Sequence, residues 1–169
     1  TLSAESAKYA QNLGRWIYFG RPIGDFGTAY TYRAMVALVG LGANTVDVAI
    51  YPKTHTDAAG AVLTGEKTYT IHFETLPPTP EGGFWSVTAY NEENFLIDNP
   101  IDRYCVNDRS AYRLNEDGTL DITLSKEAPE DPSNWLPVSD GEFHLFMRIY
   151  LPDMNALDAW QPPVIHIQE

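Results

Sequence analysis

Apolar and polar residues alternate along several short segments of the chain, which is the pattern of β-strands that bury one face. Residues 84–90 show it most clearly, because aromatic and β-branched residues dominate there. The same pattern predicts strands over residues 46–51, 67–74, 84–90, 120–124, 142–150 and 164–167, and shorter ones over residues 96–97, 104–106 and 112–114. Turn residues separate these segments, and Asp117-Gly118 predicts a hairpin between residues 112–114 and the strand that begins at Leu120.

The first 44 residues show helical spacing instead. A helix is predicted over residues 2–19, with Ser3 as its N-cap and an apolar face formed by Tyr9, Leu13, Trp16 and Ile17. A second helix is predicted over residues 28–41, with an apolar face formed by Tyr32, Met35, Val36 and Val39. Two helices followed by many short strands predict a mainly β protein, an antiparallel β-sandwich with two N-terminal helices. We expect residues 1–169 to form a single domain, in which the helical segment 1–44 packs on the β-sandwich of residues 45–169.

Composition narrows the classes of partner. The net charge is −12, whereas nucleic acids and anionic membranes attract basic surfaces. We therefore expect no nucleic-acid partner. No apolar run approaches the ~20 residues that a membrane-spanning helix needs, so we expect no membrane insertion within this chain. Cys105 is the single cysteine, which excludes an internal disulfide and a cysteine-rich metal site.

A series of motifs in a fixed order covers roughly residues 28–165. They include residues 32–34, 40–44, 50–52, 76–78, 83–90, 99–104, 117–122, 134–137 and 148–152. In content and order these segments resemble the bacterial domain-of-unknown-function family 1214, whose members are often found C-terminal to a domain of family 1254. The resemblance implies a jelly-roll-like β-sandwich, and it implies neither an established reaction nor catalytic residues.

Histidines are the first candidates for metal or acid–base chemistry. His72, His144 and His166 all fall within predicted strands, and Glu74 shares a strand face with His72. If the three strands converged, these side chains could hold a metal ion. However, the chain has neither a His-x-His pair nor a His-Glu-x-x-His motif, so we expect no metal and no cofactor. No serine lies in a Gly-x-Ser-x-Gly elbow either.

Aromatic residues are abundant, at 12% of the chain, and two tryptophans fall in proline-bounded loops. Such loops at the ends of a sandwich could bind a sugar ring or an apolar ligand. The predicted ligand pocket contains Trp135, Arg148, Tyr150 and Trp160, with Arg103 and Tyr104 as the next candidates. In the alternative interpretation, each tryptophan closes one end of the sandwich and each arginine holds loops together.

The sequence therefore favours a non-catalytic ligand-binding or assembly module of an envelope-associated or secreted bacterial protein. Its expected partners are a small-molecule or carbohydrate ligand, a second domain, or another copy of the chain. One alternative is a hydrolase- or lyase-type enzyme that uses an Arg/Tyr/His cluster or a histidine-bound metal. Another is a purely structural module that packs on a partner domain or a second copy.

Overall fold

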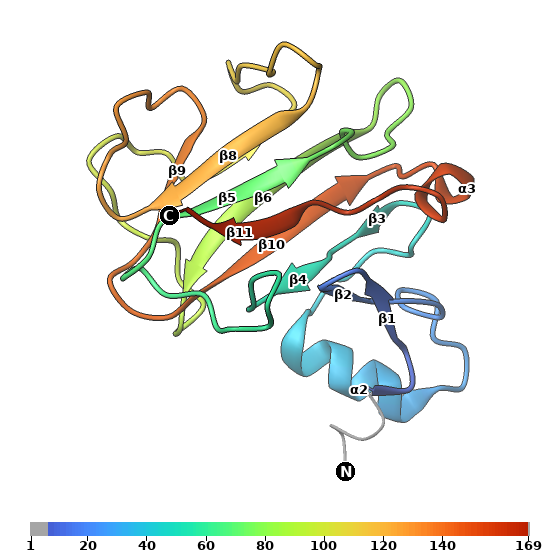
Figure 1. Ribbon diagram of the computed structural model, residues 1–169. Coiled ribbons are helices and arrows are strands. Elements are labelled where there is room, and N and C mark those ends of the chain that lie inside the picture. Colours follow the sequence, from blue (N-terminus) through green and yellow to red (C-terminus); the bar gives the residue numbers. More distant parts are fainter. Residues whose placement is uncertain (1–6, 169) are drawn as a thin grey trace.

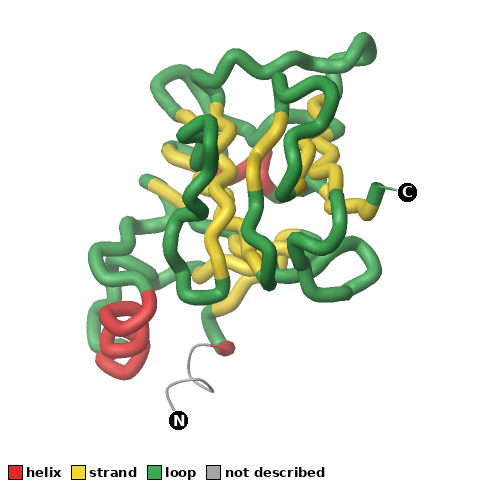
Figure 2. The backbone as a smooth tube through the Cα atoms, turned by 90° about the vertical axis from the view of Figure 1, so that its left-hand side faces the viewer, coloured by secondary structure: helices red, strands yellow, loops and turns green. Residues whose placement is uncertain are grey.

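The computed structural model describes residues 7–168, which form two β-sheets packed face to face (Figure 1). The larger sheet has the strand order β1 (Ala10–Leu13), β2 (Trp16–Phe19), β4 (Lys53–Thr54), β10 (Phe143–Tyr150), β6 (Phe84–Asn91) and β7 (Cys105–Asn107), and β3 (Ala49–Ile50) also pairs with β10. The smaller sheet has the order β11 (Val164–Ile167), β5 (Tyr69–Phe73), β8 (Leu120–Ser125) and β9 (Trp135–Pro137). The two named helices are α2 (Tyr30–Val39) and the short α3 (Met154–Leu157), and Figure 2 shows α2 set apart from the strands.

The pair β6–β10 is the longest in the larger sheet and decides which side chains enter the core. The strands are antiparallel over eight residues, from Phe143 opposite Asn91 to Tyr150 opposite Phe84. The odd-numbered residues of β10 are buried between the sheets, against the buried residues of the smaller sheet (Tyr69, Ile71, Phe73, Leu120, Ile122 and Leu124). Because side chains alternate along a strand, the even-numbered residues of β10 face the outer side of the larger sheet.

One proline divides the neighbouring strand in two. The predicted strand over residues 46–51 is reduced to β3, because residues 45–49 form hydrogen-bonded turns. Pro52 follows and has no N–H to donate, although its carbonyl accepts a bond from the Met147 N–H at 2.7 Å. Pairing with β10 then resumes at β4, where Lys53 lies opposite Phe146.

The predicted helix over residues 2–19 is wrong from Ala10 onward. Ser3, its predicted N-cap, lies outside the described residues. Residues 10–19 form the hairpin β1–β2, in which Leu13 lies opposite Trp16 and Gly14 takes a φ of +60° in the turn. Residues 16–19 are consecutive aromatic and β-branched residues, which favour a strand. The hairpin extends the larger sheet through the pairing of Ile17 with Lys53, so segment 1–44 is only partly helical.

The second predicted helix is present as α2, and one buried side chain fixes its position. Tyr32 is fully buried and stacks on Tyr9 at a ring distance of 3.9 Å. The edges of Phe19 and Phe26 pack against the same ring. The Tyr32 hydroxyl donates to the Gly20 carbonyl at 3.2 Å, and burial, followed by the neighbouring Tyr9, raises the pKa of Tyr32 to about 12. The helix is therefore tied to the hairpin by the packing of Tyr32 and by its hydrogen bond to Gly20.

The prediction of a mainly β, mainly antiparallel protein is confirmed. Strands β5, β6, β8, β10 and β11 lie within two residues of their predicted bounds. The Asp117-Gly118 turn is present, with Gly118 at a φ of +87°, but residues 112–114 form no strand in the described part of the chain. Strand β9, which was not predicted, pairs with β8 in parallel. The jelly-roll connectivity stays a prediction.

Between residues 7 and 168, no helix is long and apolar enough to cross a membrane.

Replacing Tyr32 with alanine should lower the free energy of unfolding by about 3–5 kcal/mol, because it removes a buried aromatic ring and leaves a cavity between α2 and the hairpin. Tyr30→Ala is the matched control, since Tyr30 lies on the same helix and is 62% exposed. Tyr30→Ala should lower the free energy of unfolding by less than about 1 kcal/mol. Chemical denaturation of both variants measures the difference. Equal losses would contradict the anchoring role of Tyr32.

Candidate functional site

A groove of about 800 Å³ lies between α2 and the outer face of the larger sheet. Its lining comes from the hairpin, from α2 and the segment after it, and from the sheet: Ile17, Tyr18, Phe19, Ile23, Met35, Val36, Leu38, Val39, Gly40, Leu41, Gly42, Ala43, Tyr51, Lys53, His55, Phe146 and Arg148. A volume of this size is typical of small-molecule sites.

The two walls of the groove differ in chemistry. On the α2 side the lining is apolar, with Met35 and Val36 buried at its base. Leu38, Val39 and Leu41 stand at its mouth and are 74%, 62% and 85% exposed. On the sheet side the lining carries polar and cationic groups from β4, from the residues beside it and from β10. The groove is therefore amphipathic across its width.

Two cations share one aromatic ring on the sheet wall. The Lys53 Nζ lies 5.0 Å from the centroid of Phe146, and the Arg148 guanidinium carbon lies 5.6 Å from the same centroid. Arg148 also donates to the Tyr90 hydroxyl at 2.8 Å and to Thr88 Oγ1 at 3.2 Å. These contacts hold the guanidinium against the sheet. All three partners are neutral, so they do not compensate its positive charge.

Neither cation has a carboxylate partner among residues 7–168, although the chain carries a net charge of −12. Burial lowers the pKa of Lys53. Burial, followed by the Lys53 charge, also lowers the pKa of His55, and the charge of Glu142 opposes this only in part. The sheet wall is thus a locally positive region on an acidic protein.

His144 lies beside this wall and is almost completely buried, with 2% of its surface exposed. Its ring stacks on Tyr90, which is its cross-strand partner, and lies 5.0 Å from the ring of His55. Burial first, then Lys53 and His55, lower the pKa of His144 to about 4, so the imidazole is neutral at pH 7. Its Nε2 atom is buried and has no hydrogen-bond partner among the described residues.

A second, smaller hollow of about 410 Å³ provides a contrast. It is lined by polar and apolar residues in nearly equal parts, and its lysine, Lys126, lies 2.6 Å from the Asp140 carboxylate. The lysine of that hollow is thus paired with a carboxylate, whereas, within the described residues, Lys53 and Arg148 in the groove are not.

The structure does not bring the predicted pocket residues together. Arg148 lines the groove, and Tyr150 lies further along the same strand, stacked on Phe84 at 4.3 Å. Trp135 and Trp160 are buried, at 3% and 8% exposure, and neither lines the groove. Their indole N–H groups donate to the carbonyls of Ser125 and Thr75. Two buried indoles cannot form an exposed stacking surface.

Arg103 and Tyr104 also lie outside the groove. The Arg103 guanidinium donates to the carbonyls of Pro132, Ser133 and Trp135, so it joins two loops. The Tyr104 hydroxyl contacts the Asp102 carboxylate at 3.3 Å. Arg103 therefore matches the alternative in which arginine holds loops together.

Sequence reasoning missed Lys53, His55 and the contribution of α2 to a site. A lysine in a two-residue strand after a proline has no distinctive local signal. The alternation of Lys53 and His55 around the buried Thr54 is the one feature that could have placed both on the same face.

The structure does not bring His72, His144 and His166 together as a metal site. His72 and His166 lie on the outer face of the smaller sheet, where His166 is opposite Thr70 in the β5–β11 pair. His144 lies on the outer face of the larger sheet. Over residues 7–168, no group of three or more His, Cys, Asp or Glu side chains could hold a metal ion.

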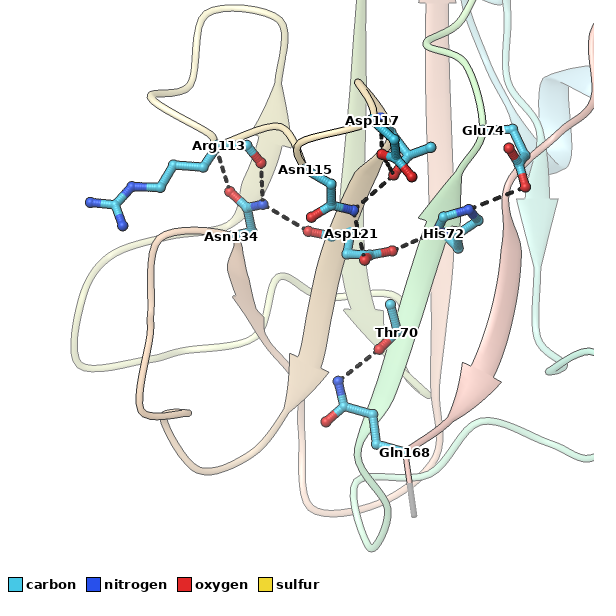
Figure 3. Close-up of polar contacts among 10 residues, drawn as sticks. Thr70, His72, Glu74, Arg113, Asn115, Asp117, Asp121, Asn134 and Gln168 are labelled. Atoms are coloured by element: carbon cyan, nitrogen blue, oxygen red, sulfur yellow. Dashed lines mark hydrogen bonds and ion pairs between the residues drawn. The ribbon is translucent and has the colours of Figure 1, made fainter.

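His72 instead belongs to a polar network on the outer face of the smaller sheet (Figure 3). Its Nδ1 atom lies 2.6 Å from Asp121 Oδ1, and its Nε2 atom lies 3.4 Å from Glu74 Oε1. Asn115 Nδ2 donates to the other Asp121 oxygen at 2.9 Å. The hydrogen bond to Asp121 is the largest cause that raises the pKa of His72, with Glu74 adding to it.

The two sheets, their pairing and the amphipathic groove define a mainly β-sandwich module. Residues 48–154, more than half of the chain, match the family described as "Protein of unknown function (DUF1214)". The chain belongs to this family. No curated protein matches it.

Two solved structures are similar to the chain. The crystal structure of a protein from Vibrio parahaemolyticus has a TM-score of 0.68 and 28% sequence identity, over 82% of this chain and 35% of that one. The crystal structure of an uncharacterised protein from Burkholderia cenocepacia has a TM-score of 0.54 and 20% identity, over 81% of this chain and 32% of that one, which shows a likeness of fold alone. The chain thus spans about a third of the length of each.

His72 should make stability depend on pH. Its folded pKa is raised above 6.5, so its contribution to stability is complete below the unfolded pKa and is lost as the pH rises through the folded pKa. His72→Gln should therefore lower the melting temperature more at about pH 5.5 than at about pH 8.5. His166→Gln, an exposed histidine on the same face, is the control and should show little difference. A larger loss for His72→Gln at the higher pH would contradict the assignment.

Proposed function

We propose that this chain is a non-catalytic ligand-binding module, and that its ligand lies in the groove between α2 and the outer face of the larger sheet. The observation that carries the proposal is an amphipathic groove of about 800 Å³. Its α2 side holds apolar side chains at partial exposure, and such surface gains free energy when a ligand covers it.

The lining favours binding over catalysis. Among the described lining residues there is no serine, threonine, cysteine, aspartate or glutamate. A hydrolase or lyase in this groove would lack a serine, threonine or cysteine nucleophile and a carboxylate base, and the neutral His144 is buried away from solvent. A binding role needs only shape, apolar area and a few polar groups, and the groove has all three.

The second candidate function is assembly, in which another protein surface covers the groove. Leu38 and Leu41 favour it, because they are 74% and 85% exposed, which is unusual for leucines. The two similar structures are more than twice as long as this chain. A partner domain or a second copy could therefore pack on the mouth of the groove, and the module would then serve assembly.

Val39→Trp should block the groove, because Val39 lines it and is 62% exposed, so a larger side chain can enter the groove without disturbing the core. The neutral fluorescent probe N-phenyl-1-naphthylamine should bind the wild-type protein and bind Val39→Trp at least about tenfold more weakly. Fluorescence titration measures both affinities.

Leu114→Trp is the matched control, since Leu114 is a half-exposed apolar residue that does not line the groove. It should bind the probe as the wild type does. If the wild-type protein binds no probe and is a dimer that Val39→Trp dissociates, the groove is an assembly surface and the binding proposal is wrong.

A further inference from the structure

We propose that the ligand of the groove is a single-chain amphipathic anion, whose head group lies by Lys53 and Arg148 and whose apolar chain lies along α2. This inference rests on the proposed function and adds the class of ligand and its orientation. The head group is a carboxylate or a phosphate, because both offer negatively charged oxygens to a lysine and an arginine.

The first step is the uncompensated charge. Partly buried cations in proteins normally pair with an acid, because an unpaired charge loses hydration without compensation. Lys53 and Arg148 contact the neutral groups of Phe146, Tyr90 and Thr88, and neither has an acidic partner within residues 7–168. On a chain with 23 acidic residues, two cations left without a carboxylate in one groove indicate that an external anion compensates them.

The second step is the position of the two charges. Both lie within 6 Å of the Phe146 ring, at 5.0 and 5.6 Å from its centroid, so one anionic head group beside the two cations would be attracted by both. His55, two residues from Lys53 on the same strand face, adds a further nitrogen beside this position. The described groove lining contains no carboxylate that would repel the anion.

The third step is the opposite wall. Met35, Val36 and Val39 present only apolar atoms to the groove from successive turns of α2. A head group alone would leave the exposed residues of this wall, Leu38, Val39 and Leu41, in contact with water, whereas an alkyl chain gains about 0.8 kcal/mol for each methylene that it buries. A purely apolar ligand would in turn leave the two cations uncompensated. An amphipathic anion covers the apolar α2 wall with its chain and compensates the two cations with its head group.

Isothermal titration calorimetry with four probes that each carry a ten-carbon chain tests the inference: decanoate, decyl phosphate, 1-decanol and decyltrimethylammonium. Decanoate or decyl phosphate should bind at least about tenfold more tightly than 1-decanol, because a charged hydrogen bond supplies the difference. The stronger of the two anions identifies the head group. The cationic probe should bind more weakly than 1-decanol.

Substitutions of Lys53 test whether this residue is responsible for the preference for an anion. Lys53→Met should weaken the binding of the preferred anion about tenfold and leave 1-decanol unchanged, and Lys53→Arg should retain the wild-type affinity. Lys126→Met removes a lysine that is paired with Asp140 in the other hollow, and it should bind every probe as the wild type does.

Two outcomes overturn the inference in different ways. If 1-decanol binds as tightly as both anions and Lys53→Met changes nothing, the groove binds apolar ligands without a charged head group, and the proposed function stands alone. If neither the four probes with ten-carbon chains nor N-phenyl-1-naphthylamine bind the wild-type protein, the proposed function fails together with the inference.

Discussion

The antiparallel pairing of β10 with β6 is the constraint on which the rest of the structure depends. Because side chains alternate along a strand, one eight-residue segment serves two environments. Its odd-numbered residues fill the core between the sheets, and Phe146 and Arg148 form part of the sheet wall of the groove. A shift of this pairing by one residue would exchange the two sets and remove both core and groove.

The groove has a second wall only because the N-terminal hairpin holds α2 in place. Strand β2 extends the larger sheet at Lys53, and Tyr32 inserts between the rings of Tyr9, Phe19 and Phe26. Lys53 and Arg148 give the groove its positive charge. Burial is the first cause that lowers the pKa of both His55 and His144, and the charge of Lys53 is the second. Packing thus provides the shape of the site, and two cations provide its charge.

The sequence predicted the long strands and α2 well, because alternation and helical spacing are local properties. It misplaced the N-terminal hairpin, since Leu13 and Trp16 satisfy helical spacing and also lie opposite each other across a two-residue turn. Arg148 was predicted as a site residue and lines the groove. Trp135 and Trp160 were also predicted as site residues but are buried, because local sequence does not distinguish a tryptophan of the core from one at a binding surface. Lys53 acquires its role from Phe146 and α2, which are distant in the sequence, so no local pattern could identify it.

The most direct test of the amphipathic groove is a crystal structure with 10-bromodecanoate, whose bromine atom can be located by its anomalous scattering. The account predicts the carboxylate beside Lys53 and Arg148, and the bromine atom against the α2 wall near Met35 and Val39. A ligand in the reverse orientation, or one bound on the outer face of the smaller sheet near His72, would contradict it.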